Sequence, residues 1–277
     1  MSTTALQQWA EKLDNPTLSV IPHDYLRPQQ EPLIEQSVYA VHVPQLELPH
    51  AKDPYTVALS VWCSLLYRLT GDDDIVLYVI GDKAIRFTIQ PTWTFAELYS
   101  AVAAELNAIS DFQSVDFDEL SQHFKSAQDL ELFPQLLRLG FTSEDDFSLS
   151  KFEHNLFDCV LNLHKNSSTL QIIYNSLLYS QERISILADQ FTEFLSQVLK
   201  DDSLCITKVS LVTPSSSSNL PDPTKNLGWC DFVGCIHDIF QDNAEKFPER
   251  TCVVETPAND SAESRVFSYR DINRASN

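Results

Sequence analysis

Three groups of side chains in this sequence have types that could bind a metal ion or take part in catalysis. Asp72, Asp73 and Asp74 are adjacent carboxylates. A calcium loop spaces its ligands at alternating positions, so we predict a solvated acidic turn instead. Cys230 and Cys235 are separated by four residues. No second cysteine pair or histidine couple accompanies them at metal-ligand spacing, so we interpret both as reduced, structural cysteines.

The third group pairs a histidine with a carboxylate, a combination that serves general acid–base catalysis. His154 stands four residues before Asp158, at the beginning of a strand expected over residues 156–164. The alternating pattern of this strand places His154 on its outward side. We therefore interpret His154 as a surface histidine and predict no catalytic, cofactor-binding or metal-binding residue in this chain.

Composition narrows the expected partners and compartment. The 277 residues include 19 Lys+Arg and 39 Asp+Glu, a formal net charge of −20. No basic stripe is visible, so neither nucleic acid nor a membrane is an expected partner. The longest apolar run, Tyr55–Leu69, is too short to span a bilayer, and the N-terminus lacks the features of a signal peptide. Six cysteines without a Cys-x-x-Cys pair fit the cytoplasmic location that we expect.

Three expected helices have clear capping residues. Asp53, followed by a proline, begins a helix that ends at Gly71. Thr94 and Glu97 form a capping box for a second helix, and Ser180 caps a long third one. A shorter helix is expected over 4–13, and strands over 38–43, 75–80, 85–89, 156–164, 170–174 and 206–212. Because helices and strands alternate, the fold class is α/β, with packed layers.

Proline and serine content sets the expected domain boundaries. Pro22, Pro28 and Pro32 exclude a helix from residues 18–32, called the strap below, which should be extended. The run over 214–226 is rich in serine and proline and is typical of a linker. We therefore expect a helix and lead-in over 1–17, a domain over 18–213, a linker over 214–228 and a final segment over 229–277.

Three stretches of the domain over 18–213 carry a family resemblance. They read Leu-Ser-Val-Ile-Pro-His-Asp-Tyr-Leu-Arg-Pro from residue 18, Leu-Leu-Tyr-Arg-Leu-Thr-Gly-Asp-Asp-Asp-Ile-Val from residue 65 and Ile-Tyr-Asn-Ser-Leu-Leu-Tyr-Ser from residue 173. They resemble the C-terminal half of a condensation domain, which has a chloramphenicol-acetyltransferase-like fold. The catalytic signature of that family is His-His-x-x-x-Asp-Gly. Here Glu153 replaces the first histidine before His154, and Cys159 replaces the glycine. The resemblance therefore implies a catalytically inactive half domain with a structural role.

The final segment carries a second resemblance. The expected elements are a helix over 236–247, a buried strand over 251–255, a second strand over 265–267 and a helix that opens at Ser268. Pro248 ends the first helix, and Ser268 has capping-box spacing to Asp271. With the stretch Phe-Pro-Glu-Arg-Thr-Cys-Val-Val-Glu from residue 247, this pattern resembles the opening of an adenylate-forming domain of the nonribosomal-peptide-synthetase type.

The order of the two parts resembles that in the fungal L-2-aminoadipate reductase family, and this resemblance covers the whole chain. It implies an amino-terminal part of a longer enzyme that adenylates L-2-aminoadipate with ATP and Mg²⁺. A phosphopantetheine thiol, attached by a phosphopantetheinyl transferase, would then take the acyl group, and NADPH would reduce the thioester to 2-aminoadipate 6-semialdehyde for lysine biosynthesis.

The cofactor sites of such an enzyme are expected beyond Asn277. The sequence contains no phosphate-binding loop with a lysine, no carrier-type serine and no Gly-x-Gly-x-x-Gly. Two alternatives remain open from the sequence. The chain could be the amino-terminal part of another enzyme related to nonribosomal peptide synthetases, or a stand-alone interaction module.

Overall fold

The computed structural model describes residues 3–14, 16–17, 19–47, 52–114, 117–120, 137–151, 156–164, 169–218, 220, 234–255 and 265–276. His154 and Cys230, two residues of the groups considered above, lie outside these ranges. The chain divides into two units, Met1–Leu220 and Pro221–Asn277, and each is described by itself.

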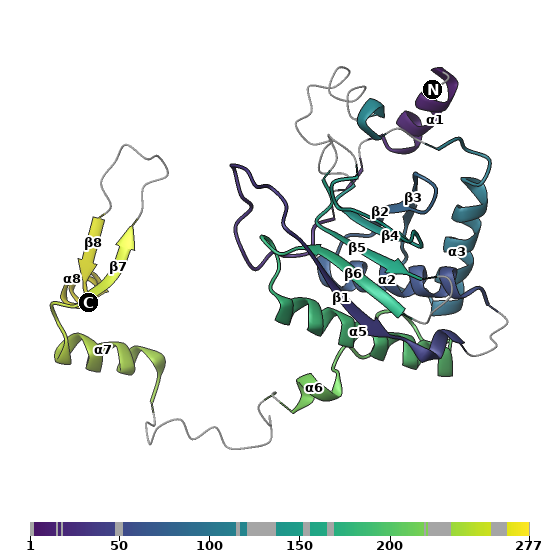
Figure 1. The fold of residues 1–277 in the computed structure, drawn as a ribbon. Coiled ribbons are helices and arrows are strands. Elements are labelled where there is room, and N and C mark those ends of the chain that lie inside the picture. Colours follow the sequence, from purple (N-terminus) through teal and green to yellow (C-terminus); the bar gives the residue numbers. More distant parts are fainter. Residues whose placement is uncertain are drawn as a thin grey trace. The chain divides into compact units, whose positions relative to one another are not determined.

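A mixed sheet forms the centre of the first unit (Figure 1). Its strands are β1 (Gln36–His42), β2 (Asp74–Val79), β3 (Lys83–Thr88), β4 (Leu139–Thr142), β5 (Cys159–Leu163) and β6 (Thr169–Asn175), in the order β1-β6-β5-β4-β2-β3. The neighbours β2, β4 and β5 are parallel, and the other pairs are antiparallel. The predicted antiparallel pairing of the strand over 156–164 with that over 170–174 is confirmed.

Strand β4 was not predicted from the sequence. It has only four residues, Leu-Gly-Phe-Thr, and a glycine inside a short apolar run is more typical of a turn or a bulge. Gly140 serves close packing here, because a Cβ at this position would lie 3.2 Å from the Cβ of Tyr78 on the adjacent strand. The missing side chain lets the tyrosine ring lie directly against the sheet.

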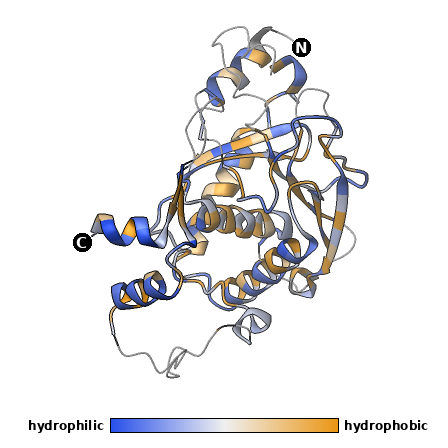
Figure 2. Cartoon of the chain, turned by 90° about the vertical axis from the view of Figure 1, so that its left-hand side faces the viewer, coloured by the Kyte–Doolittle hydropathy of each residue, from blue (hydrophilic) through white to orange (hydrophobic). Residues whose placement is uncertain are grey.

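Three helices form a layer that spans the sheet from one edge to the other (Figure 1). They are α2 (Pro54–Thr70), α3 (Phe95–Ala108) and α5 (Gln181–Lys200). Helix α2 packs on both others, α3 lies against the edge strand β3, and α5 lies against the opposite edge strand β1. Figure 2 shows long hydrophobic stretches in the helices and strands of this interior. No helix among the described residues is long and apolar enough to cross a membrane.

The predicted helix caps of this layer are confirmed. Asp53 accepts the Thr56 backbone N–H at 2.8 Å, and Gly71 ends α2 with a φ of 82°, in the left-handed region that favours glycine. Thr94 forms the capping box of α3, and Ser180 caps α5. The expected amino-terminal helix is also present as α1 (Thr3–Lys12), and a short 3-10 helix, η1 (Pro44–Glu47), follows β1.

The strand predicted over 206–212 is wrong. Cys205 forms an isolated bridge with Thr94, and the chain then turns, with the Lys208 N–H donating to the Cys205 carbonyl at 2.8 Å. The backbone carbonyls that follow are not paired with a strand. The Arg68 guanidinium donates to the carbonyl oxygens of Ile206 and Val209 at 3.0 and 2.9 Å. A side chain of α2 therefore takes the place that a neighbouring strand would have.

The solvated turn predicted over Asp72–Asp74 is wrong for its last residue. Asp74 begins β2, accepts a hydrogen bond from the Thr17 N–H at 2.9 Å and pairs with Arg86 at 2.9 Å. Burial alone raises the pKa of Asp74, but the hydrogen bonds and charge of Arg86 outweigh burial and lower the pKa from its ordinary value. The carboxylate has a structural partner within the fold.

The first residues of the expected linker form a short helix, α6 (Pro214–Ser217). Thr213 caps it, and the Ser215 hydroxyl donates to Asp189 on α5 at 2.7 Å. Asn219 and residues 221–233 lie outside the described residues.

The second unit contains α7 (Ile236–Lys246), β7 (Thr251–Glu255), β8 (Arg265–Ser268) and α8 (Tyr269–Ser276). The two strands pair antiparallel, and both helices predicted from the sequence are present. The expected burial of the strand over 251–255 is wrong. Val253, Val254 and Val266 are 43, 51 and 60 % exposed, because α8 packs on the strands without covering these side chains.

Candidate functional site

Of the histidine and the carboxylate considered above as a possible pair, the described one, Asp158, lies in a buried ion-pair cluster. Its side chain is 1 % exposed. Oδ2 accepts from the Arg27 guanidinium, with Arg138 Nη1 and His23 Nε2 each at 3.4 Å. Arg27 and His23 belong to the strap, while Arg138 immediately precedes β4. The Asp158 N–H donates to the Arg138 carbonyl at 2.7 Å, which fixes the two residues side by side. The cluster holds the strap against the amino-terminal ends of β4 and β5.

The charges around this carboxylate suit a structural role. Two guanidinium groups and an imidazole surround it, and burial among them lowers the pKa of Arg138 although the charge of Asp158 opposes that shift. Asp158 Oδ1 and Arg138 Nε are buried without hydrogen-bond partners. A general base needs a path to its substrate, whereas this carboxylate is enclosed by its own partners. The arrangement positions the strap and offers no open side for a reacting group.

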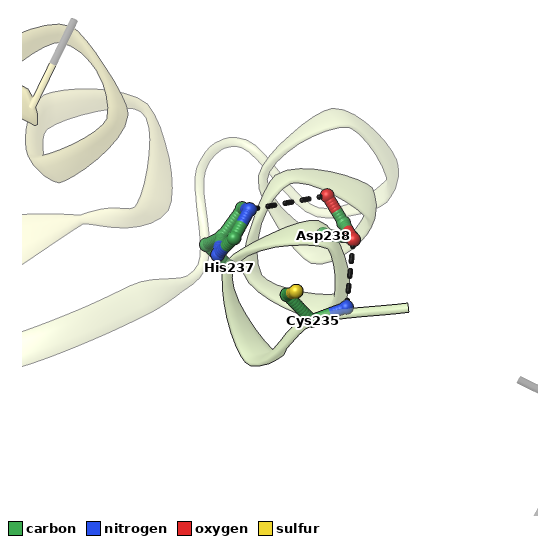
Figure 3. A group of neighbouring side chains, drawn as sticks. All are labelled: Cys235, His237 and Asp238. Atoms are coloured by element: carbon green, nitrogen blue, oxygen red, sulfur yellow. Dashed lines mark hydrogen bonds and ion pairs between the residues drawn. The ribbon is translucent and has the colours of Figure 1, made fainter. Parts of the chain in front are cut away.

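A second group of potential ligands lies at the start of α7 (Figure 3). One ligand atom each from Cys235, His237 and Asp238 lies within 4.8 Å of the other two. Asp238 Oδ2 accepts the Cys235 N–H at 2.8 Å, and Oδ1 lies 3.5 Å from His237 Nε2. The sequence analysis considered Cys235 only with Cys230. The signal that it missed is the run Cys-Ile-His-Asp, whose members share one helical turn.

The surroundings of this second group fit a metal ion poorly. The His237 and Asp238 side chains are 74 and 47 % exposed, so little holds them in a fixed geometry. One oxygen of Asp238 already accepts a hydrogen bond from the first turn of the helix. The partial positive charge of a helix N-terminus also opposes a cation. A structural zinc site takes four ligands, and among the described residues these three donors do not complete one.

The described cysteines other than Cys235 show no built site either. Cys63, Cys159, Cys205, Cys235 and Cys252 are all free. Burial raises the pKa of the Cys63 and Cys159 thiols, which disfavours the thiolate needed for nucleophilic chemistry or metal binding. The pKa of the Cys205 thiol is shifted the other way, because hydrogen bonds from Thr207 lower it.

A third polar cluster lies at the carboxyl ends of the parallel strands β2 and β4. Lys151 Nζ donates to Tyr78 Oη at 2.9 Å, to Asp82 Oδ1 at 2.6 Å and to Glu144 Oε2 at 3.0 Å. Burial of the ring, with the nearby charges of Asp82 and Glu144, raises the pKa of Tyr78 above its ordinary range. A tyrosine held in the neutral form beside a lysine is a weak nucleophile, so the cluster fits a structural role.

Two hollows in the first unit lie apart from these clusters. A cavity of about 80 Å³ between the strap and α5 is lined mainly by apolar side chains, including Ile21, Ile184 and Leu187. It is smaller than the roughly 300 Å³ at which ligand pockets usually begin. A more open hollow of about 350 Å³ is lined by Lys52, Phe95 and residues 198–202 at the end of α5. Neither hollow is lined by Asp158 or Lys151.

The family of condensation domains matches residues 82–220, half of the chain. The chain belongs to the condensation domain family. Solved structures agree on the fold of this condensation domain. A four-domain nonribosomal peptide synthetase, crystallised in its holo form with AMP and glycine, superposes on 98 % of this chain and 24 % of its own, with a TM-score of 0.63 and 14 % identity. The X-domain from teicoplanin biosynthesis covers 75 % of this chain and 56 % of its own, with a TM-score of 0.60 and 15 % identity.

Curated relatives of this condensation-family chain are much longer proteins. L-2-aminoadipate reductase of Saccharomyces cerevisiae is 61 % identical over 274 residues, 97 % of this chain and 20 % of the relative. The L-2-aminoadipate reductase large subunit of Candida glabrata is 53 % identical over 269 residues, 97 % of this chain and 19 % of the relative. The chain thus spans about one fifth of the length of these relatives. The resemblance to fungal L-2-aminoadipate reductases inferred from the sequence is confirmed.

Proposed function

We propose that this chain is the amino-terminal part of an L-2-aminoadipate reductase. The observation that carries the proposal is the 61 % identity to the Saccharomyces cerevisiae reductase across 97 % of the chain. The complete enzyme would activate L-2-aminoadipate with ATP, transfer the acyl group to a phosphopantetheine thiol and reduce the thioester with NADPH. The product would be 2-aminoadipate 6-semialdehyde, used in lysine biosynthesis in the cytoplasm.

Within that enzyme, residues 18–213 act as a condensation-like platform without catalysis of their own. The sequence lacks the His-His-x-x-x-Asp-Gly signature, and Asp158 is enclosed by arginines that leave it no open side. A linker over 214–228 then leads to residues 229–277, the first elements of an adenylation domain. The exposed valines of β7 and β8 support that assignment, because apolar side chains at 43–60 % exposure are suited to packing against further structure.

The residues of this chain do not fit the cofactors of the complete enzyme. Its five glycines form neither a phosphate-binding loop nor a dinucleotide-binding motif, and no serine stands in a carrier setting. ATP with Mg²⁺, phosphopantetheine and NADPH would be held elsewhere in the enzyme, and a phosphopantetheinyl transferase would act there too. What these residues contribute is a folded support and the start of the adenylating unit.

The test is an exchange assay on two proteins. The purified 277-residue chain should show no aminoadipate-dependent exchange of pyrophosphate into ATP, whereas the complete gene product should show it and should reduce aminoadipate with NADPH. Exchange by the purified chain would contradict the domain assignment. A native product no larger than 31.4 kDa in a cell extract would instead favour a stand-alone interaction module.

A second candidate function is loading of another amino acid by an enzyme related to peptide synthetases. Bacitracin synthase 1 of Bacillus licheniformis is 21 % identical over 95 % of this chain, which is the observation that favours it. A panel of amino acids in the exchange assay separates the two. Selective exchange with L-2-aminoadipate supports the reductase, and selective exchange with another amino acid supports the synthetase.

A further inference from the structure

The chain after β4 crosses the sheet as an irregular segment that buries two apolar side chains. Residues 143–151 contain neither helix nor strand, yet Phe147 and Leu149 within them are buried. The Phe147 ring lies 5.4 Å from that of Tyr78, which stands on β2. This segment therefore covers part of the sheet face that the three helices leave free.

Side chains supply several of the hydrogen bonds that fasten this segment to the sheet. Asn162 on β5 donates from Nδ2 to the Glu144 carbonyl, and Gln36 on β1 accepts the Leu149 N–H at 2.8 Å. The strands beneath are joined by backbone ladders, as between β4 and β5. A segment without a backbone ladder to the sheet can open locally at a free energy below that of global unfolding.

Lys151 makes the strongest of these attachments. Its ammonium group reaches Tyr78 Oη, Asp82 Oδ1 and Glu144 Oε2 at 2.9, 2.6 and 3.0 Å. It also lies 5.4 Å from the centre of the Tyr78 ring and 5.7 Å from that of Phe147. Hydrogen bonds to charged groups are about twice as strong as neutral ones. One side chain thus ties the end of the segment to its own beginning and to the β2–β3 turn.

Two buried oxygens at the base of the segment lack partners. Thr142 Oγ1 and Asn162 Oδ1 are both buried without a hydrogen bond, on residues that are paired in register across β4 and β5. A buried polar atom without a partner destabilises the closed state relative to one in which water can reach it. The closed position therefore has an unfavourable contribution at the place where the segment leaves the sheet.

We infer that residues 143–151 form a flap that opens as a unit while the sheet stays folded, and that Lys151 is its latch. Opening would hydrate Thr142 and Asn162 and would uncover the side of the Tyr78 ring that Phe147 contacts. The charges that contact the latch come from two segments. Asp82 lies in the β2–β3 turn, and Glu144 lies in the flap itself.

Hydrogen exchange on the whole 277-residue chain tests this inference. The Leu149 N–H and the Phe157 N–H, which donates to the Leu149 carbonyl at 3.1 Å, report on the flap. In the wild type both amides should exchange faster than the amides of α2. Their exchange rates should increase with urea concentration to the same extent. Lys151→Met should speed exchange at both by about tenfold. Amides of α2 and α5 should keep their rates.

Two further variants keep the test decisive. Tyr78→Phe removes only the hydroxyl, which accepts from Lys151 and contacts the carboxylates of Asp82 and Glu144 as a donor. It should speed flap exchange by a smaller factor even if Lys151→Met fails to fold. Lys200→Met, at the end of α5, is the matched control and should leave the flap unchanged. The inference is overturned if flap amides exchange only with global unfolding, or if a folded latch variant speeds exchange equally everywhere.

Discussion

Valines mark a difference between the two units of this chain. In the first unit, the strand residues Val76, Val79 and Val160 are 4 % exposed or less, in a sheet covered by a layer of helices. In the second, Val253, Val254 and Val266 are 43–60 % exposed. The same residue type on similar secondary structure thus meets two environments. Burial here depends on which elements cover a strand, and among the described residues of the second unit α8 packs on both strands without covering these valines.

The ion pairs of the two units also differ in burial. Breaking one pair in each unit should give the largest difference in lost stability. Asp158→Asn leaves the largely buried Arg138 and the partly exposed Arg27 without their counter-charge and should destabilise the first unit by about 3 kcal/mol. Glu255→Gln removes an exposed partner of Arg265 and should cost about 0.5 kcal/mol. Urea unfolding, followed in each unit by hydrogen exchange of its own peptides, measures both. Equal losses would show that the Asp158 cluster is hydrated in solution.

Shortening apolar side chains should give the next contrast. Leu66→Ala empties a fully buried position on α2 and should lower the free energy of unfolding by about 3 kcal/mol. Val266→Ala shortens a side chain that is 60 % exposed and should change the free energy of unfolding by about 0.5 kcal/mol or less. The same urea experiment reports both. A large loss at Val266 would mean that this valine is covered in solution, for example by self-association, which a concentration series would reveal.

The sequence predicted local features of both units well. The caps at Asp53, Thr94 and Ser268 depend on residues no more than three positions away, so their pattern is visible in the sequence. The errors arise where a residue distant in the sequence determines the local backbone structure. The carbonyl of Ile206 is bonded by Arg68, 138 positions earlier, and no local pattern contains that information.

The candidate site shows the same limit. The spacing of His154 and Asp158 suggested a pair, yet Asp158 meets Arg27, which is 131 positions away in the sequence. Only the fold brings the strap to the start of β5. The group at Cys235 was missed for a different reason, since all its members are local. Cysteine spacing alone does not reveal this group, because it combines one cysteine with a neighbouring histidine and aspartate.

Low pH should reduce the contributions of Asp74 and Asp271 to stability by different amounts, although the pKa of both side chains is lowered. For Asp74, burial raises the pKa and Arg86 more than compensates. For Asp271, an exposed residue, hydrogen bonds from Ser268 lower the pKa. A lowered folded-state pKa gives stability that is present above the ordinary aspartate value of about 4 and is lost as the pH falls through the lowered value.

Asp74→Asn should therefore cost about 1 kcal/mol at pH 7, after allowance for solvent screening, and progressively less below pH 4. Asp271→Asn should show the same pH dependence with a smaller amplitude. Urea midpoints of the three proteins between pH 2.5 and 7 measure the effect. A loss for Asp74→Asn that stays constant down to pH 2.5 would mean that Arg86 stabilises this site by geometry and not by charge.

Helix caps should give the smallest contrast, because a cap acts within one turn. Thr94→Ala in the first unit and Ser268→Ala in the second each remove a side-chain oxygen that accepts a backbone N–H, from Glu97 at 3.3 Å and from Asp271 at 3.2 Å. Each should cost about 1 kcal/mol, since both caps are exposed and neither depends on the core. Exchange of the first-turn amides of α3 and α8 measures the loss locally. A much larger loss at Ser268 would show that the second unit, with little buried apolar surface, depends on its caps for its fold.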